Sequence, residues 1–129
     1  MPKTVIIVDH DLGFAFWLGH ALDQAGYNAL PAINVVSAVN LLTELGGAVD
    51  LVVINAGVAE ADSFIVNLRR VQPHSKVIAV VDDPDSLPVG VPSADLAEHK
   101  PIVVDETARA DWVATVRMVL SPRAVPFQF

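Results

Sequence analysis

The chain has 129 residues, of which 53% are hydrophobic and 18% are charged, and it contains no cysteine. These values predict one globular domain with a packed core and exclude disulfides and cysteine-based metal centres. The net charge of −7 argues against the basic face that nucleic acids require. No apolar run approaches the ~18 residues of a membrane span, and the short apolar start is not a signal peptide. We therefore expect a cytoplasmic protein with neither membrane nor nucleic-acid partners.

The first two predicted elements are a buried strand and an amphipathic helix. Residues 5–8 are all apolar, which is typical of a strand covered on both faces. The cluster Asp9-His10-Asp11 follows directly. Over residues 12–25 apolar side chains recur at three- and four-residue spacing, which predicts a helix that Asp11 caps and Gly26 ends.

The next segments continue the alternation of strand and helix. Residues 27–33 form a weak strand, and Pro31 within it favours an edge position. Asn34 precedes a second helical pattern, which Gly46-Gly47 ends. The third strand, Asp50–Asn55, has four consecutive apolar residues before its polar end.

The following part of the chain departs from the regular alternation of strands and helices. Asp62 or Ser63 is expected to open a third helix that Pro73 ends, and residues 76–81 form a fourth buried strand. Pro84, Pro88 and Pro92 come next, four residues apart. A proline inside a helix costs about 3 kcal/mol or more, so we expect the fourth helix to be short or missing.

The last segments complete the predicted domain. Residues 94–98 form a weak fifth strand before Lys100-Pro101, and Asp105 begins a last helix with Trp112 facing inward. We expect one domain over residues 3–120 and a tail over residues 121–129. The tail contains Phe127 and Phe129, which either pack back onto the domain or contact a partner.

Alternating strands and helices predict a parallel sheet with helices on both faces. Ligands of such sheets bind outside the carboxyl ends of the strands, where Asn55 stands. An amide is a poor nucleophile and a weak metal ligand, whereas a carboxylate is both nucleophile and ligand. Asn55 is thus either a switch residue frozen in one state or a strand end that hydrogen-bonds its own loop.

In this order and spacing, the features resemble the receiver domain of two-component response regulators. The resemblance covers almost the whole chain and depends on four features: the acidic cluster from Asp9, the strand end at Asn55, the stretch Ser93-Ala94-Asp95, and Lys100-Pro101. It implies an α/β, flavodoxin-like (CheY-like) three-layer sandwich with a five-stranded parallel sheet of order 2-1-3-4-5.

Active receivers accept a phosphoryl group on an aspartate beside a magnesium ion, and the resemblance identifies the matching positions here. The phosphoacceptor matches Asn55, and the second metal-binding acid matches His10, although magnesium prefers oxygen ligands to imidazole. The hydroxyl position matches Val81 and the aromatic position matches Ala97. Each of these four residues lacks the group that its position serves, so the chain resembles a degenerate receiver, or pseudo-receiver.

Three positions of the pocket are retained, namely Asp9, Lys100 and Pro101. The resemblance implies a cis peptide bond before Pro101. We expect Lys100 to pair with Asp9, either as a substitute for the missing phosphate contacts or as a structural ion pair. Asp9 and Asp11 are either weak divalent-cation ligands or solvated acids, one of which caps a helix. His10 is either an exposed loop residue or a sensor of pH or of a transition metal.

Two tryptophans are candidate contacts with a partner, because tryptophan is enriched in interface hot spots. Trp112 fits the inward face of its helix, which favours core packing. Trp17 lies beside the apolar stripe of the first helix and is expected to be partly exposed. The first and last helices are neighbours in the family's fold, so a partner surface there would use both.

The leading hypothesis is a signalling module in a two-component phosphorelay, with no enzymatic activity and no cofactor. It is not phosphorylated at the usual site and binds a protein partner, or itself, through a helix face. One alternative is a phosphorylatable or metal-binding receiver that uses Asp9, Asp11 or Asp82. The other is a small-molecule sensor or enzyme that uses the crevice near Asn55, although no phosphate-binding glycine loop follows the first strand.

Overall fold

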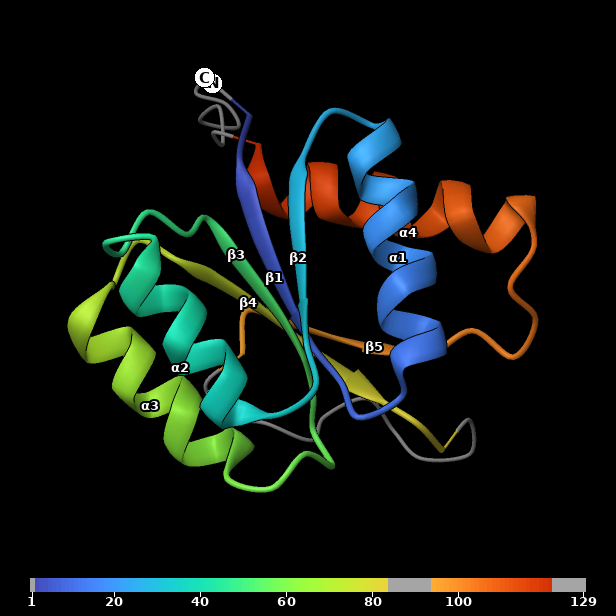
Figure 1. Cartoon of the computed structure of the whole chain (residues 1–129). Coiled ribbons are helices and arrows are strands. Elements are labelled where there is room, and N and C mark those ends of the chain that lie inside the picture. The colour runs from blue at the N-terminus through green and yellow to red at the C-terminus, as the bar shows by residue number, and fades with distance from the viewer. Residues whose placement is uncertain (1, 84–93, 122–129) are drawn as a thin grey trace, which may run out of the picture.

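The computed structural model describes residues 2–83 and 94–121. Its five strands all pair in parallel, in the order β2-β1-β3-β4-β5 (Figure 1). The strands are β1 (Thr4–Val8), β2 (Asn28–Ala32), β3 (Leu51–Asn55), β4 (Lys76–Val81) and β5 (Leu96–His99). The helices are α1 (Leu12–Gln24), α2 (Val35–Glu44), α3 (Ala61–Val71) and α4 (Glu106–Leu120). The predicted flavodoxin-like sandwich and its strand order are confirmed.

The helices cover the two faces of the sheet in pairs, with α2 and α3 on one face and α1 and α4 on the other (Figure 1). Successive residues of a strand point to opposite faces, so each strand contributes to both layers of the core. In β1, Ile6 packs toward α2 and α3, whereas Val5 and Ile7 pack toward α1 and α4. All five residues of β1 and of β3 are buried, as expected for interior strands of a parallel sheet.

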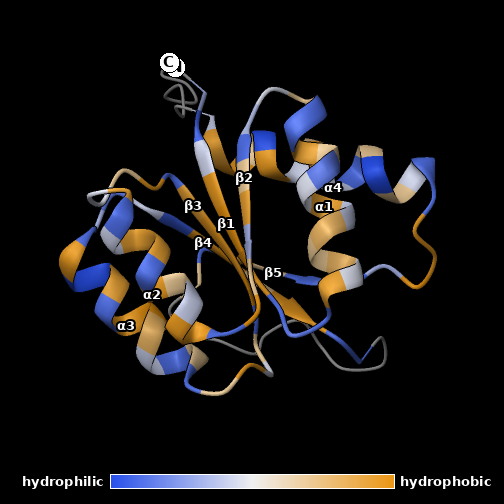
Figure 2. Ribbon diagram, in the orientation of Figure 1, coloured by the Kyte–Doolittle hydropathy of each residue, from blue (hydrophilic) through white to orange (hydrophobic). Residues whose placement is uncertain are grey.

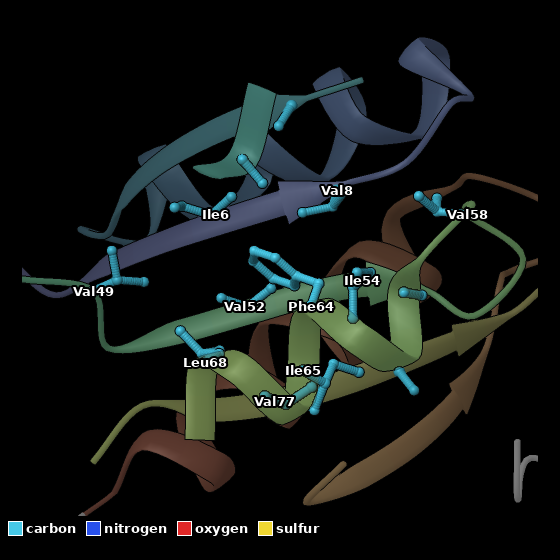
Figure 3. Packing of buried hydrophobic residues seen from close by; sticks show 14 residues of the cluster. Ile6, Val8, Val49, Val52, Ile54, Val58, Phe64, Ile65, Leu68 and Val77 are labelled. Atoms are coloured by element: carbon cyan, nitrogen blue, oxygen red, sulfur yellow. The ribbon is translucent and has the colours of Figure 1, made fainter. Parts of the chain in front are cut away.

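The core is built from aliphatic side chains, and Figure 3 shows the cluster beneath α3. Phe64, Ile65 and Leu68 of α3 lie over Val52 and Val77 of the sheet. The hydropathy colours of Figure 2 show the same division, with mainly apolar central strands β1, β3 and β4 and banded helices around them. Burial of this apolar surface, at roughly 25 cal/mol per Å², is the main term that stabilises the sandwich.

The polar residues at the helix starts act largely as predicted. The side chains of Asp11, Asn34 and Asp105 each accept a hydrogen bond from the backbone N–H three residues along, which caps α1, α2 and α4. Gly26 and Gly47, at the ends of the first two helices, have φ angles of 99° and 86°. Both values lie in the left-handed region that favours glycine.

Three local predictions are wrong. Helix α3 begins at Ala61, where the Glu60 carbonyl accepts from Phe64 N–H, and no side chain caps it. Strand β5 covers Leu96–His99 instead of 94–98, because the Asp95 carboxylate accepts from Val77 N–H and fixes the strand's start. The bond before Pro101 is trans, since no cis peptide occurs in the described residues; trans is the lower-energy form of an X–Pro bond.

Two predictions fall on residues that the structure does not describe. The expected loss of the fourth helix concerns residues 84–93, and the roles of Phe127 and Phe129 concern the tail after residue 121. Between β4 and β5, the described residues 82–83 and 94–95 hold no helix. Among the described helices, none has the length and apolar character needed to cross a membrane.

Candidate functional site

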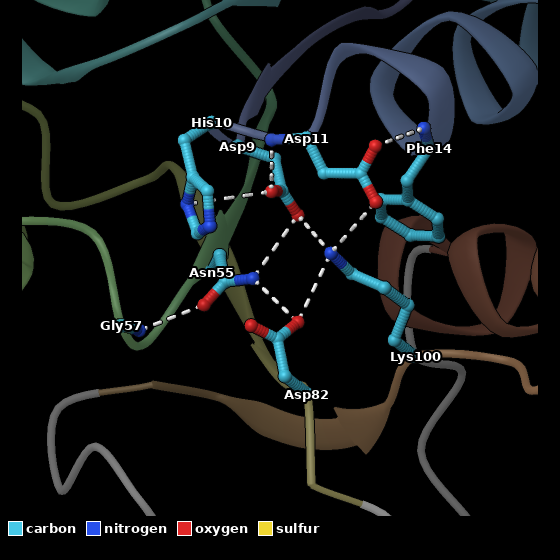
Figure 4. A network of polar contacts seen from close by, with 8 residues as sticks. All are labelled: Asp9, His10, Asp11, Phe14, Asn55, Gly57, Asp82 and Lys100. Carbon is cyan, nitrogen blue, oxygen red and sulfur yellow. Dashed lines mark hydrogen bonds and ion pairs between the residues drawn. The ribbon is translucent and has the colours of Figure 1, made fainter.

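Four polar side chains meet at the carboxyl edge of the sheet (Figure 4). Asp9 directly follows β1, Asn55 is the last residue of β3, Asp82 directly follows β4 and Lys100 directly follows β5. Parallel strands end at one edge, so residues far apart in the sequence are brought within hydrogen-bond distance. The predicted Asp9–Lys100 pair is confirmed, with Nζ 3.0 Å from Oδ2.

Asn55 is 1% exposed, and both ends of its amide are occupied. Its Nδ2 donates to Asp82 Oδ1 at 2.8 Å and to Asp9 Oδ2 at 3.2 Å. Its Oδ1 accepts from Gly57 N–H at 2.7 Å, so the side chain also anchors the loop after β3. The NH₂ group thus faces two carboxylates and the oxygen faces a donor, an arrangement that a carboxylate at this position would not satisfy.

Asp9 is the buried acid of the site, with 1% exposure. Besides Asn55 and Lys100, it accepts a hydrogen bond from Asp11 N–H at 2.8 Å on Oδ1. A buried charge is tolerated when it is paired and hydrogen-bonded, and Asp9 meets both conditions.

The Lys100 ammonium occupies the point where three carboxylates converge (Figure 4). Its Nζ lies 3.0 Å from Asp9 Oδ2, 3.0 Å from Asp82 Oδ1 and 3.6 Å from Asp11 Oδ2. The ring centroid of Phe14 is 4.9 Å from Nζ, at the distance of a cation–π contact. Three carboxylates against one ammonium leave two negative charges uncompensated within this group.

The charges at the site shift two pKa values. Partial burial raises the pKa of Asp82, but hydrogen bonds from Lys100 and Asn55 outweigh it, and the net pKa lies below the usual value of 3.8. Burial lowers the pKa of Lys100, but hydrogen bonds to Asp82 and Asp9 outweigh it, and the net pKa lies above 10.5. Both groups therefore remain charged in the folded protein at neutral pH.

The lowered pKa of Asp82 predicts a pH dependence of stability. A carboxyl group whose pKa is lower in the folded chain stabilises the fold above its unfolded pKa and loses this effect as pH falls through the folded value. We expect Asp82→Asn to destabilise the protein at neutral pH, and the difference from wild type to shrink below pH 3.8. Urea unfolding followed by circular dichroism, from about pH 7 to about pH 2, measures this difference.

Asp111→Asn, at an exposed carboxylate of α4 outside the network, is the matched control. A difference that persists unchanged below pH 3.8, or that is the same for the control variant, would contradict the role of Asp82.

The donor set does not fit a magnesium ion as it stands. Magnesium takes oxygen ligands in octahedral geometry. Here the inward oxygens of Asp9 and Asp82 already face the Asn55 NH₂ group and the Lys100 ammonium. In the described part of the chain, no three His, Asp or Glu side chains are arranged to hold a metal.

Of the other predicted pocket residues, Val81 and Ala97 bring no polar side chain to the site. Val81 contacts Lys100 through its backbone, because the Val81 carbonyl accepts a hydrogen bond from Lys100 N–H at 2.9 Å. Ala97 packs against the core on the α2–α3 face. His10 lies in the loop after β1, where its side chain is 63% exposed and its Nδ1 lies 3.8 Å from Asp9 Oδ1. Both of its predicted roles remain predictions.

An apolar hollow of about 340 Å³ adjoins the site between α1 and the loop after β5. It is lined in part by Trp17, Pro101 and Val104, and by Phe14, whose ring centroid is 6.0 Å from that of Trp17. Trp17 is partly exposed, as predicted. Trp112 is 5% exposed and makes an edge contact with Phe14, so its predicted place in the core and the proximity of the two helices are both confirmed.

Sequence reasoning missed two contacts of this site. From the sequence, Asp82 is expected only as an acid that an unconventional receiver could use. In the structure Asp82 pairs with both Asn55 and Lys100. The rule that polar residues directly after parallel strands share one edge identifies Asp82 as readily as Asp9. Phe14 reads as an ordinary core residue, because nothing in its helical spacing reveals the lysine above its ring.

Fold and strand order define a CheY-like flavodoxin architecture, and solved structures of this class resemble the chain. No protein-family model and no curated protein matches it. A response regulator from Thermotoga maritima is 24% identical with a TM-score of 0.73, over 93% of this chain and 98% of the other.

Two further structures show the same likeness. A CheY-like response regulator receiver domain protein from Methanospirillum hungatei is 18% identical with a TM-score of 0.74, over 93% of this chain and 94% of the other. An orphan response regulator of H. pylori is 20% identical with a TM-score of 0.75, over 92% and 97%. At these identities the similarity is one of fold.

Proposed function

We propose that the chain is a receiver-like module of two-component signalling that works without phosphorylation at the usual site. In this proposal it is a cytoplasmic protein, not an enzyme, and needs no metal ion or other cofactor. Its output is contact with a protein, either another chain or a second copy. The shared fold with response regulators supports the signalling context, and the chemistry of the carboxyl edge supports independence from phosphate.

The observation that carries the proposal is the amide of Asn55. Its nitrogen has no free lone pair to attack phosphorus, and its oxygen already accepts the hydrogen bond from Gly57 N–H. Phosphoryl transfer to this strand end therefore lacks a nucleophile.

The Lys100 ammonium supports the same proposal. It is held by carboxylates on both sides of the pocket, Asp9 and Asp82, each at 3.0 Å. The uncompensated negative charge of the group repels an incoming phosphate dianion. The pocket is thus held in one arrangement by its own side chains, and no phosphoryl group is required to complete it.

One alternative receives support from a specific observation. Asp82 lies at the mouth of the pocket with its side chain 52% exposed, and its carboxylate is ionised at neutral pH. Phosphorylation at this acid would make the chain an unconventional receiver. The two proposals differ in whether the chain gains mass and in which residue carries the added group.

Incubation with acetyl phosphate and Mg²⁺, followed by intact-mass analysis, separates these proposals. We expect the wild-type mass to remain unchanged, because the strand end offers no carboxylate to the phosphoryl donor. A stoichiometric gain of one phosphoryl group would overturn the leading proposal. Its absence in Asp82→Asn would then assign the group to Asp82.

A further inference from the structure

Helix α3 presents an exposed ridge of three residues at four-residue spacing, Asp62, Val66 and Arg70. Residues four apart lie on one side of a helix, and this side faces away from the buried residues Phe64 and Leu68. Val66, at the middle of the ridge, is 50% exposed. The ridge is therefore acidic at one end, apolar at its centre and basic at the other end.

This pattern is complementary to itself. Asp62 and Arg70 each lie four residues from Val66, or about 6 Å along the helix axis. When two copies of the ridge meet antiparallel about a two-fold axis at Val66, each Asp62 faces Arg70 of the second copy. A two-fold interface requires such a self-complementary surface, and the two valines meet at its centre.

The neighbouring Arg69 does not compete for this role. Its Nη2 lies 2.7 Å from Asp95 Oδ2, and its Nη1 donates to the Ser75 carbonyl at 2.9 Å. These contacts turn Arg69 toward the start of β5. Arg70 is left as the exposed basic residue of the last turn of α3.

The charges of the ridge permit association at this face. The chain carries a net charge of −7, so two copies repel each other over most approaches. The ridge itself is neutral, by contrast, since Asp62 is matched by Arg70. Repulsion between two copies is therefore weak where the two ridges meet.

Helix α2 lies beside α3 on the same face of the sheet (Figure 1) and adds exposed apolar residues next to the ridge. No charged residue occurs in α2 from Val35 to Thr43, and its Val36 is 68% exposed. A groove of about 830 Å³ lies between α2 and α3, and Val39 and the 72% exposed Val71 line it. Side chains of a second copy can bury this surface, which supplies the non-directional part of the attraction.

We propose that the α3 ridge and the adjoining groove form a two-fold interface between two copies of this chain. This inference deepens the proposed function and rests on it in one respect, namely that the association needs no phosphoryl group.

Sedimentation equilibrium over about 10 μM to 1 mM protein tests the interface. We expect wild type to approach twice the chain mass of 13.7 kDa. Asp62→Lys and Arg70→Glu each place like charges opposite one another twice, so each alone weakens the dimer at least about tenfold. An equimolar mixture of the two variants restores both opposite-charge pairs, and we expect it to form a heterodimer.

Glu106→Lys and Arg117→Glu are matched controls, because they make the same charge reversals in the first and last turns of α4. We expect both control variants to dimerise as wild type does. Val66→Asp, which places two carboxylates at the axis, provides an independent test, and circular dichroism checks that every variant is folded.

A wild-type protein that stays monomeric, or a mixture that does not reassociate, would overturn the interface and leave the proposed function standing. A dimer that forms only after incubation with acetyl phosphate, together with a gain in mass, would overturn the proposed function instead.

Discussion

Replacing Lys100 with methionine is expected to destabilise the fold by on the order of 3 kcal/mol, the cost of leaving a buried charge without its partner. Asp9 is 1% exposed and lies 3.0 Å from the Lys100 ammonium. Without that ammonium, Asp9 keeps hydrogen bonds from Asp11 N–H and Asn55 Nδ2 but has no counter-charge. Asp82 and Asp11 then add repulsion across the same pocket.

Urea denaturation at neutral pH measures this loss as a lower midpoint with an unchanged slope. Lys76→Met is the matched control, since Lys76 lies in the exposed first position of β4. We expect that variant to stay within about 0.5 kcal/mol of wild type. Equal effects of the two substitutions would contradict a special role for the Lys100 ion pairs.

Replacing Asn55 with aspartate is expected to destabilise the metal-free protein by about 2–4 kcal/mol. The substitution removes the hydrogen bonds that Nδ2 donates to Asp9 and Asp82, 3.2 and 2.8 Å away, and places a third carboxylate between them. Magnesium accepts oxygen ligands of this kind, so we expect millimolar Mg²⁺ to recover about 1–2 kcal/mol. Wild type lacks this carboxylate and is expected to gain no such stability.

The same variant offers a nucleophile at the strand end, so acetyl phosphate with Mg²⁺ is expected to add one phosphoryl group to it and none to wild type. Asn28→Asp, the same chemical change at an exposed position of β2, is the control. If the Asn55→Asp protein is as stable in EDTA as wild type, the Asn55 amide does not stabilise the fold through its hydrogen bonds to Asp9 and Asp82. Urea denaturation with and without Mg²⁺ gives the stability, and intact-mass analysis gives the phosphorylation.

Much of the fold was predictable because its signals are local. The apolar runs of β1 and β3, and the capping residues Asp11, Asn34 and Asp105, each act through neighbours in the sequence. Strand β5 was displaced in the prediction because its start depends on a contact with β4, made by Asp95. The start of α3 was missed because no side chain caps this helix, so the sequence carries no local signal at its first residue.

The sequence predicted which residues form the candidate site better than it predicted how those residues contact one another. The position of each residue at a strand end placed Asp9, Asn55 and Lys100 at one edge. Asn55 bridges Asp9 and Asp82 because of the register between β3 and β4 and because its Nδ2, not its Oδ1, faces the two carboxylates. Neither feature can be read from the sequence. The contact between Lys100 and the Phe14 ring depends on how α1 lies against the sheet.

The sequence alone determined which chemical groups exist at the carboxyl edge, because the identity of the side chain at each strand end is part of the covalent structure. An amide at position 55 lacks a nucleophile in any fold. Only the tertiary structure decided what the remaining groups do to one another, because charges interact over a few ångströms and the chain is long. Folding brings the Lys100 ammonium to three carboxylates from two loops, after β1 and after β4, and it leaves the ridge of α3 facing solvent.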